Sequence, residues 1–273
     1  MAETTKHRRQ LHELGAMVWA MVWGRIGLKV AKLEGRTNQS RPNRQNSAMS
    51  LTERDQEILE HVRRYRLTTT EALRKYFFPE AKAGAEKNVL RRLVGDHLQA
   101  RPLYAKKVYY QLTPAAARTL GEPEEVAEPL GPQALVRVYG VFAFCCLGGR
   151  DKTVLTRREF ISAFEGFAHQ IDLTQSHYYL DYDGKTVRLG QIVVEQGGEY
   201  QRLITKCRRI IERGREIPGL QEIIADELMV IALILAEESK REALCAQLRK
   251  NPLPVWCRVE VAPELGYLMP HVA

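Results

Sequence analysis

Basic and amide side chains gather in one stretch of the sequence, and they are the residue types that contact DNA. Asn88, Arg91 and Arg92 recur at a spacing that places them on one face of a helix. Asparagine can pair with adenine through two hydrogen bonds and arginine with guanine, whereas lysine neutralises phosphate. For any one of these residues a solvated helix face is the commoner explanation, so the interpretation depends on the surrounding elements. The residues expected to contact DNA are Lys82, Lys87, Asn88, Arg91, Arg92, Arg101, Lys106 and Lys107.

Helices and a hairpin are expected to position these side chains. Thr52 is a helix cap, Pro79 ends a short second helix, and Leu90 and Leu93 lie on the inward face of a third helix. This order is typical of a winged helix-turn-helix, whose third helix enters the major groove while the hairpin lies on phosphate. The expected helices cover residues 53–66, 71–78, 82–97 and 115–120, and the expected strands cover 101–104 and 106–112.

Short motifs in this stretch resemble the winged-helix half of replication-relaxation proteins of bacterial plasmids and integrated mobile elements. They are Thr52-Glu53-Arg54-Asp55, Ile58-Leu59, Leu67-Thr68-Thr69, Phe77-Phe78-Pro79, Leu90-Arg91-Arg92-Leu93 and the run from Tyr109 to Ala115. The match covers roughly a quarter of the chain, and many winged-helix repressors share its pattern. The resemblance implies a sequence-specific protein that binds double-stranded DNA and acts in transcription regulation or in replication and maintenance of a mobile element. It would be cytoplasmic and associated with the nucleoid or a plasmid.

The charge of the chain is unevenly distributed. Residues 1–48 hold 9 basic and 3 acidic residues, and residues 49–121 hold 14 and 8, so each segment carries a net charge of +6. Residues 122–273 hold 18 basic and 22 acidic residues, a net charge of −4. Electrostatic binding of DNA requires basic charge beside the DNA-reading unit. Five cysteines without a C-x-x-C pair indicate neither a disulfide framework nor a zinc site, and no apolar run predicts a membrane span.

Residues 1–48 are expected to be an N-terminal extension. Apolar residues from Leu11 to Leu33 predict an amphipathic helix, which would pack on the core or on a second copy in a homodimer. Residues 35–48 are rich in Arg, Asn, Gln and Ser and predict a disordered tail. Because Met49 directly precedes the first capped helix, an error in the gene start is an alternative explanation of the extension. Residues 49–121 form the winged-helix unit, and an acidic, proline-containing linker over residues 122–132 follows it.

Residues 133–273 are expected to form an α/β domain. Its predicted order is helix, strand, strand, helix, strand, helix, strand, which resembles the core of PD-(D/E)XK nucleases. Replication-relaxation proteins carry a similar C-terminal half, and the stretch from Val193 to Glu199 followed by Lys206 to Arg209 takes the place of its acidic pair and basic helix. The expected fold class is therefore α+β, with an N-terminal winged helix-turn-helix followed by a C-terminal α/β nuclease-like domain.

Cleavage of DNA by such a domain needs two carboxylates that hold Mg²⁺ and a lysine beside the second one. Glu195 is expected at the end of a central strand, near Asp181 or Asp183, but Gly197 occupies the place of the lysine. This favours a binding protein without a cofactor, whose inactive nuclease-like domain contacts a second copy or a protein partner. The alternative is a metal-dependent DNA endonuclease that uses Mg²⁺. Its candidate catalytic residues are Asp181, Asp183, Glu195 and Lys206.

Overall fold

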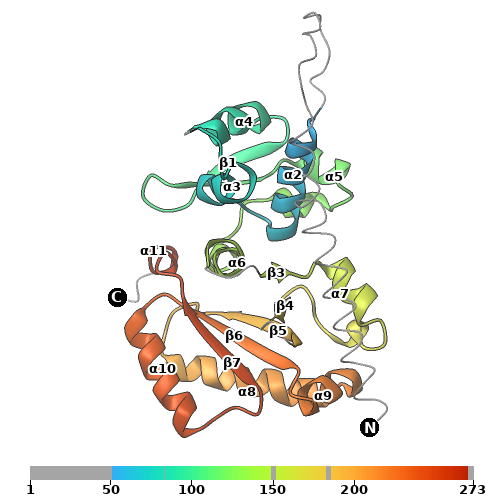
Figure 1. The fold of residues 1–273 in the computed structure, drawn as a ribbon, viewed down its shortest axis with the longest axis vertical. Coiled ribbons are helices and arrows are strands. Elements are labelled where there is room, and N and C mark those ends of the chain that lie inside the picture. The colour runs from blue at the N-terminus through green and yellow to red at the C-terminus, as the bar shows by residue number, and fades with distance from the viewer. Residues whose placement is uncertain (1–50, 83, 149–151, 183–185, 270–273) are drawn as a thin grey trace, which may run out of the picture.

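The computed structural model describes residues 51–82, 84–148, 152–182 and 186–269. They form a mixed α+β structure in which a helical region, residues 51–121, precedes a five-stranded sheet (Figure 1). We call residues 132–269 the sheet region. The N-terminal extension over residues 1–48 and the candidate residue Asp183 lie outside the described residues.

The helical region follows its local capping signals. The Thr52 hydroxyl accepts a hydrogen bond from the Asp55 amide, and the Asp55 carboxylate accepts one from the Thr52 amide, so the first helix begins with a complete capping box. The hydroxyls of Thr69 and Thr113 each accept a backbone amide hydrogen bond at the start of two further helices. The elements are α2 (Glu53–Tyr65), α3 (Thr70–Phe77), α4 (Ala85–Leu93), β1 (Leu98–Pro102), β2 (Val108–Leu112) and α5 (Pro114–Thr119).

The third helix, α4, is shorter than the sequence pattern predicted. It begins after Gly84, whose φ of 89° is left-handed, and it ends at Leu93. Val94 is extended, and Gly95 has a φ of 109°, which side-chain-bearing residues rarely adopt. The chain therefore leaves the helix before His97, and the first strand of the hairpin begins at residue 98 rather than 101.

The sheet region has the strand order β3-β4-β5-β6-β7. β4 pairs antiparallel with β5, whereas β5 with β6 and β6 with β7 are parallel pairs joined by helices. The expected order of helices and strands is present between α6 and β7, together with additional short elements. The elements are η2 (Glu124–Ala127), α6 (Pro132–Phe142), η3 (Ala143–Leu147), β3 (Thr153–Val154), α7 (Arg157–Ala163), η4 (Ala168–Gln170), β4 (His177–Tyr182), β5 (Val187–Val194), α8 (Tyr200–Arg215), α9 (Pro218–Ala225), β6 (Met229–Leu235), α10 (Glu238–Lys250), β7 (Trp256–Val261) and α11 (Leu265–Leu268).

Helices cover both faces of the sheet. α8, α9 and α10 lie on the face directed away from the helical region, and α6 lies on the other (Figure 1). A Cβ atom added at Gly140 of α6 would lie 2.4 Å from a methyl carbon of Val194, so the absence of a side chain lets this helix pack closely on β5. α6 therefore forms a layer between the sheet and the helical region.

The two regions share one hydrophobic core through α6. Tyr65 and Leu67 of the helical region belong to the same buried cluster as Tyr139 and Phe142 of α6, and the rings of Tyr65 and Phe142 lie 6.3 Å apart. The expected linker is also packed, because the buried Gln111 amide donates hydrogen bonds to the backbone carbonyls of Val126 and Glu128. Residues 122–132 thus pack against the helical region instead of forming a free spacer.

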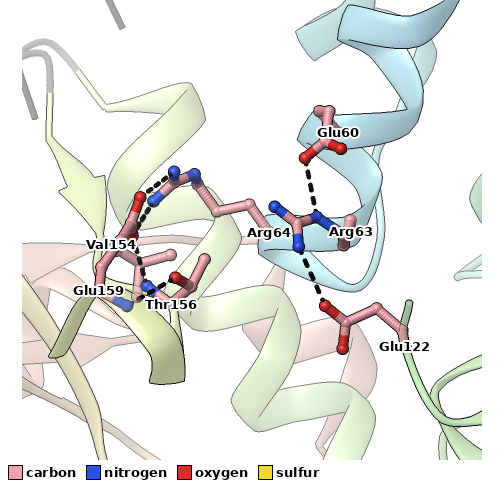
Figure 2. Close-up of polar contacts among 7 residues, drawn as sticks. All are labelled: Glu60, Arg63, Arg64, Glu122, Val154, Thr156 and Glu159. Atoms are coloured by element: carbon pink, nitrogen blue, oxygen red, sulfur yellow. Dashed lines mark hydrogen bonds and ion pairs between the residues drawn. The ribbon is translucent and has the colours of Figure 1, made fainter. Parts of the chain in front are cut away.

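An ion pair reinforces this contact at the edge of the sheet (Figure 2). Arg64 of α2 donates hydrogen bonds of 2.7 and 2.6 Å to the two carboxylate oxygens of Glu159, and another of 2.7 Å to the carbonyl of Val154. Glu159 is the N3 residue of the α7 capping box, so the same carboxylate accepts the Thr156 amide. The neighbouring Arg63 instead pairs with Glu60 and Glu122 on the more exposed side of α2.

Candidate nucleic-acid interface

α4 presents a polar face at the end of the molecule. Leu90 and Leu93 are buried against α2 and α3, which turns Lys87, Asn88 and Arg91 outward into solvent. Figure 1 shows α4 at the end of the molecule remote from α8, α9 and α10. The sequence-predicted residues Lys82, Lys87, Asn88 and Arg91 are therefore exposed together on this end, where a large ligand can approach.

Arg92 has an intramolecular partner that the sequence pattern did not reveal. Its guanidinium donates a 2.5 Å hydrogen bond to Asp55 of α2, whose side chain is only 1% exposed. Burial raises the pKa of Asp55, but hydrogen bonds from Thr52 and the charge of Arg92 outweigh it and hold this pKa below its usual value. Arg92 thus fixes α4 on α2, whereas among the described residues Arg91 donates a hydrogen bond of 3.5 Å to Asn88 on its own helix.

The two lysines at the tip of the hairpin differ in their contacts. Lys106 is exposed, and Ala105 beside it adopts a φ of 48° in the tight turn. Lys107 donates a 2.8 Å hydrogen bond to the Tyr104 hydroxyl, and the Tyr104 ring stacks on Tyr267 of α11 with centroids 5.1 Å apart. The tip therefore touches the sheet region, and Lys107 belongs to that contact.

Arg101 lies on β1 and is half-buried. It donates a 2.8 Å hydrogen bond to Gln99, whose own amide donates to the backbone of Leu112 and Ala127. Of the sequence-predicted residues, Arg92, Arg101 and Lys107 are thus held by neighbouring side chains. We therefore assign the open part of the interface to Lys82, Lys87, Asn88, Arg91 and Lys106.

The acidic residues expected to flank a metal ion do not lie together. Asp181 pairs in register with Arg188 of β5, seven positions before Glu195, which is about 23 Å along a strand. The predicted neighbourhood of Asp181 and Glu195 is therefore wrong, because the antiparallel pairing of β4 and β5 places them at opposite ends of the sheet. Glu195 does directly follow the central strand β5, as expected.

Each of these two acids has its own basic partner. Arg258 of β7 contacts both carboxylate oxygens of Asp181, at 2.8 and 2.9 Å. Glu195, 2% exposed, accepts hydrogen bonds from Lys240 at 2.6 Å and from the backbone amide of Ala236 at 2.9 Å. Lys240 is therefore the basic residue that pairs with Glu195, whereas the sequence suggested Lys206 as the lysine beside this acid. Within the part of the chain that the structure describes, no group of three His, Cys, Asp or Glu side chains is placed to hold a metal ion.

Lys206 lies in a different place, a groove of about 740 Å³ beside α8. We call it the α8 groove. Its lining comes from α6, from the segment before β4, from β5 and from α8. Among its lining residues are five basic side chains and no acidic one, namely Arg137, Arg202, Lys206, Arg209 and Arg213. Sequence reasoning missed this groove, although the density of arginine and lysine in residues 202–215 was a visible signal.

Comparisons with known proteins find no matching family model, no matching curated protein and no matching solved structure. The resemblance to replication-relaxation proteins therefore stays a prediction that rests on the sequence motifs. None of the described helices is both long and apolar enough to cross a membrane.

Proposed function

We propose that the protein binds double-stranded DNA through α4 and the β1–β2 hairpin, as a winged helix-turn-helix. The observation that carries the proposal is the exposed group of Lys87, Asn88 and Arg91 on α4, at an end of the molecule that a duplex can reach. The inward face of this helix is fixed by Leu90 and Leu93, so its outward face has a defined orientation. A helix of this kind can be accommodated in the major groove.

The proposed roles follow from the chemistry of each side chain. Arg91 and Asn88 would read base edges, since both can form paired hydrogen bonds with purines. Lys82, Lys87 and Lys106 would contact phosphates and contribute affinity without sequence preference. Arg92 would act indirectly, because its bond to Asp55 holds α4 in place. The same proposal includes three further points that rest on the resemblance alone. They are a role in transcription or replication on a bacterial mobile element, homodimer formation, and a protein partner for the sheet region.

The contacts of the acidic residues support binding over DNA cleavage. A metal-dependent endonuclease needs neighbouring carboxylates that are available to a cation. Asp181 and Glu195 are separated along the sheet, and each is engaged by a basic side chain. We therefore propose a nuclease-like sheet region that serves contact and stability, and no catalytic residue is assigned.

Binding is tested by selecting tight-binding sequences from a randomised duplex pool and measuring affinity by fluorescence anisotropy. Arg91→Ala should weaken binding to the selected duplex by about 1–3 kcal/mol, the discrimination that a base-contacting arginine provides. The matched control is Arg118→Ala on α5, an exposed arginine whose ion pair with Glu124 lies outside the proposed interface. Unchanged affinity of Arg91→Ala, or equal loss in the control, would place the interface elsewhere.

A further inference from the structure

The α8 groove is a second concentration of positive charge. Arg202, Lys206, Arg209 and Arg213 recur every three or four residues and are exposed, so they form one row along α8. Arg137 of α6 adds a fifth cation to the lining. Within the described residues, none of these five side chains forms an ion pair.

This row runs against the composition of its surroundings. Residues 132–273 outside α8 hold 12 basic and 17 acidic residues, yet α8 holds six basic residues and one acidic residue. Like charges four residues apart, such as Arg202 with Lys206 and Arg209 with Arg213, repel each other and destabilise a helix. A solvated helix gains from mixed charges, so an unmixed row indicates a surface that meets an anionic ligand.

Buried polar atoms at the groove provide an independent indication. Gln191 of β5 lines the groove and is 6% exposed, and its side-chain oxygen has no hydrogen-bond partner within the described part of the chain. The amide can turn to present either its oxygen or its nitrogen. Burial, and then the charge of Arg137, lower the pKa of Lys206, so Lys206 would gain from an anion beside it. Both observations describe a site that a hydrogen-bonding anion would complete.

We infer that the α8 groove binds the phosphate backbone of DNA, at a site separate from α4. The row from Arg202 to Arg213 spans eleven residue steps, about 16 Å of helix, which suits a series of phosphates better than a single one. The lining contains no aromatic side chain on which a base could stack, so binding there is independent of sequence. α8 and α4 lie on opposite sides of the sheet layer (Figure 1), and the groove therefore holds a different DNA segment from the one that α4 reads.

This inference rests on the proposed function for the identity of the polyanion, and its test separates the two surfaces. The groove variant is Arg202→Gln/Lys206→Gln/Arg209→Gln. Its matched control is Arg208→Gln/Arg215→Gln/Arg249→Gln, which removes the same charge from exposed residues outside the groove. Binding to a random-sequence duplex is measured by anisotropy over a range of salt concentrations, and circular dichroism verifies that both variants are folded.

The groove variant should bind the random duplex at least tenfold more weakly, and its salt slope should fall by about 2.7, or 0.9 for each lost phosphate contact. The control should change affinity less than threefold. In the groove variant, the loss of affinity should be equal for the random and the selected duplex, whereas Arg91→Ala should weaken binding to the selected duplex only. The groove proposal can therefore fail while Arg91→Ala still weakens binding to the selected duplex. The proposed role of α4 can likewise fail while the groove variant still loses affinity. Equal loss in groove variant and control, or unchanged binding in both, would overturn the proposal.

Two measurements cover the remaining outcomes. Inorganic tripolyphosphate is the probe for a free phosphate ligand, and its binding is measured as thermal stabilisation of the protein. The DNA assignment would be overturned if the groove variant lost this stabilisation but kept its affinity for DNA. If the groove variant does not fold, the unmodified protein is acetylated with and without duplex. DNA should then slow the modification of Lys206 and leave the exposed Lys250 of α10 unaffected. Equal rates at Lys206 would contradict the inference.

Discussion

The helical region and the sheet region use their charges in different ways. Three described acids that lie on or directly after a strand of the sheet region each form an ion pair with a basic side chain. These pairs are Asp181–Arg258, Glu195–Lys240 and Glu260–Lys152. In the helical region, Lys87 and Lys106 are exposed, and neither forms an ion pair with another described residue. Under the two binding proposals, unpaired charge rather than net charge locates the binding surfaces. The α8 groove lies in residues 132–273, whose 18 basic and 18 acidic residues give no net charge.

Removing a paired charge should cost stability, and the largest effect is expected at the contact between the two regions. Glu159→Ala would leave Arg64, whose side chain is 18% exposed, without its partner and would also remove the acceptor of the Thr156 amide. Breaking a buried pair from one side costs about 3–5 kcal/mol. Urea unfolding should therefore show a loss of about 3 kcal/mol or more at neutral pH.

The pH dependence of this loss has a defined sign. Burial raises the pKa of Glu159, but Arg64 and then Thr156 lower it by more, so the pKa of Glu159 in the folded state lies below its ordinary value. A depressed pKa stabilises the folded state above the unfolded value, and this contribution is lost as the pH falls through the folded value. The difference between wild type and Glu159→Ala should thus shrink below about pH 4.5. The control Arg63→Ala removes the more exposed pairs of Figure 2 and should cost less than about 1 kcal/mol.

A smaller loss of stability is expected for a substitution at the end of the central strand. Glu195→Ala removes the acceptor of the Ala236 amide and the buried partner of Lys240, and an unsatisfied buried donor costs about 1–3 kcal/mol. DNA affinity should remain nearly unchanged. Glu237→Ala is the control, since the same lysine pairs with this exposed carboxylate at 3.2 Å. Folded Glu195→Ala protein that has lost DNA binding would contradict the separation of structural from binding charges.

The smallest effect on stability is expected for an unpaired charge at the hairpin tip. Lys106→Ala should alter the free energy of unfolding by less than about 0.5 kcal/mol, because the side chain is exposed. Its effect should appear in DNA binding, as a decrease of about 0.9 in the salt slope. Lys107→Ala should reduce the slope less, because Lys107 is bonded to Tyr104. An equal decrease for both lysines would mean that the Tyr104 contact is released when DNA binds.

Elements with local signals were predictable from the sequence. The Thr52 and Thr156 capping boxes are encoded within three or four residues, so these two helix starts could be read directly. The start of α6 at Pro132 instead falls inside the expected linker. The length of α4 was not predictable from periodicity. Apolar residues continue at helical spacing to Val94, whereas the helix ends at Leu93, since Val94 is extended and the left-handed Gly95 follows it.

Contacts between distant residues could not be predicted in this way. Asp181 and Arg258 are 77 positions apart, and Glu195 and Lys240 are 45 positions apart, so neither pair has a characteristic spacing. The sequence pattern placed Glu195 correctly after a central strand, but the partner of each acid depends on strand order and register. The α8 groove needs Arg137 of a second helix as well as the basic row, and only the row is visible in the sequence.

The packing of α6 on both the sheet and the helical region has a consequence for unfolding. Tyr65 and Phe142 are buried in the same cluster as Val194, so neither region can lose its structure without exposing apolar surface of the other. We expect residues 51–269 to unfold cooperatively as a single unit. The backbone amides of α6 should then exchange with solvent only in the globally unfolded state and report the full free energy of unfolding in hydrogen-exchange experiments.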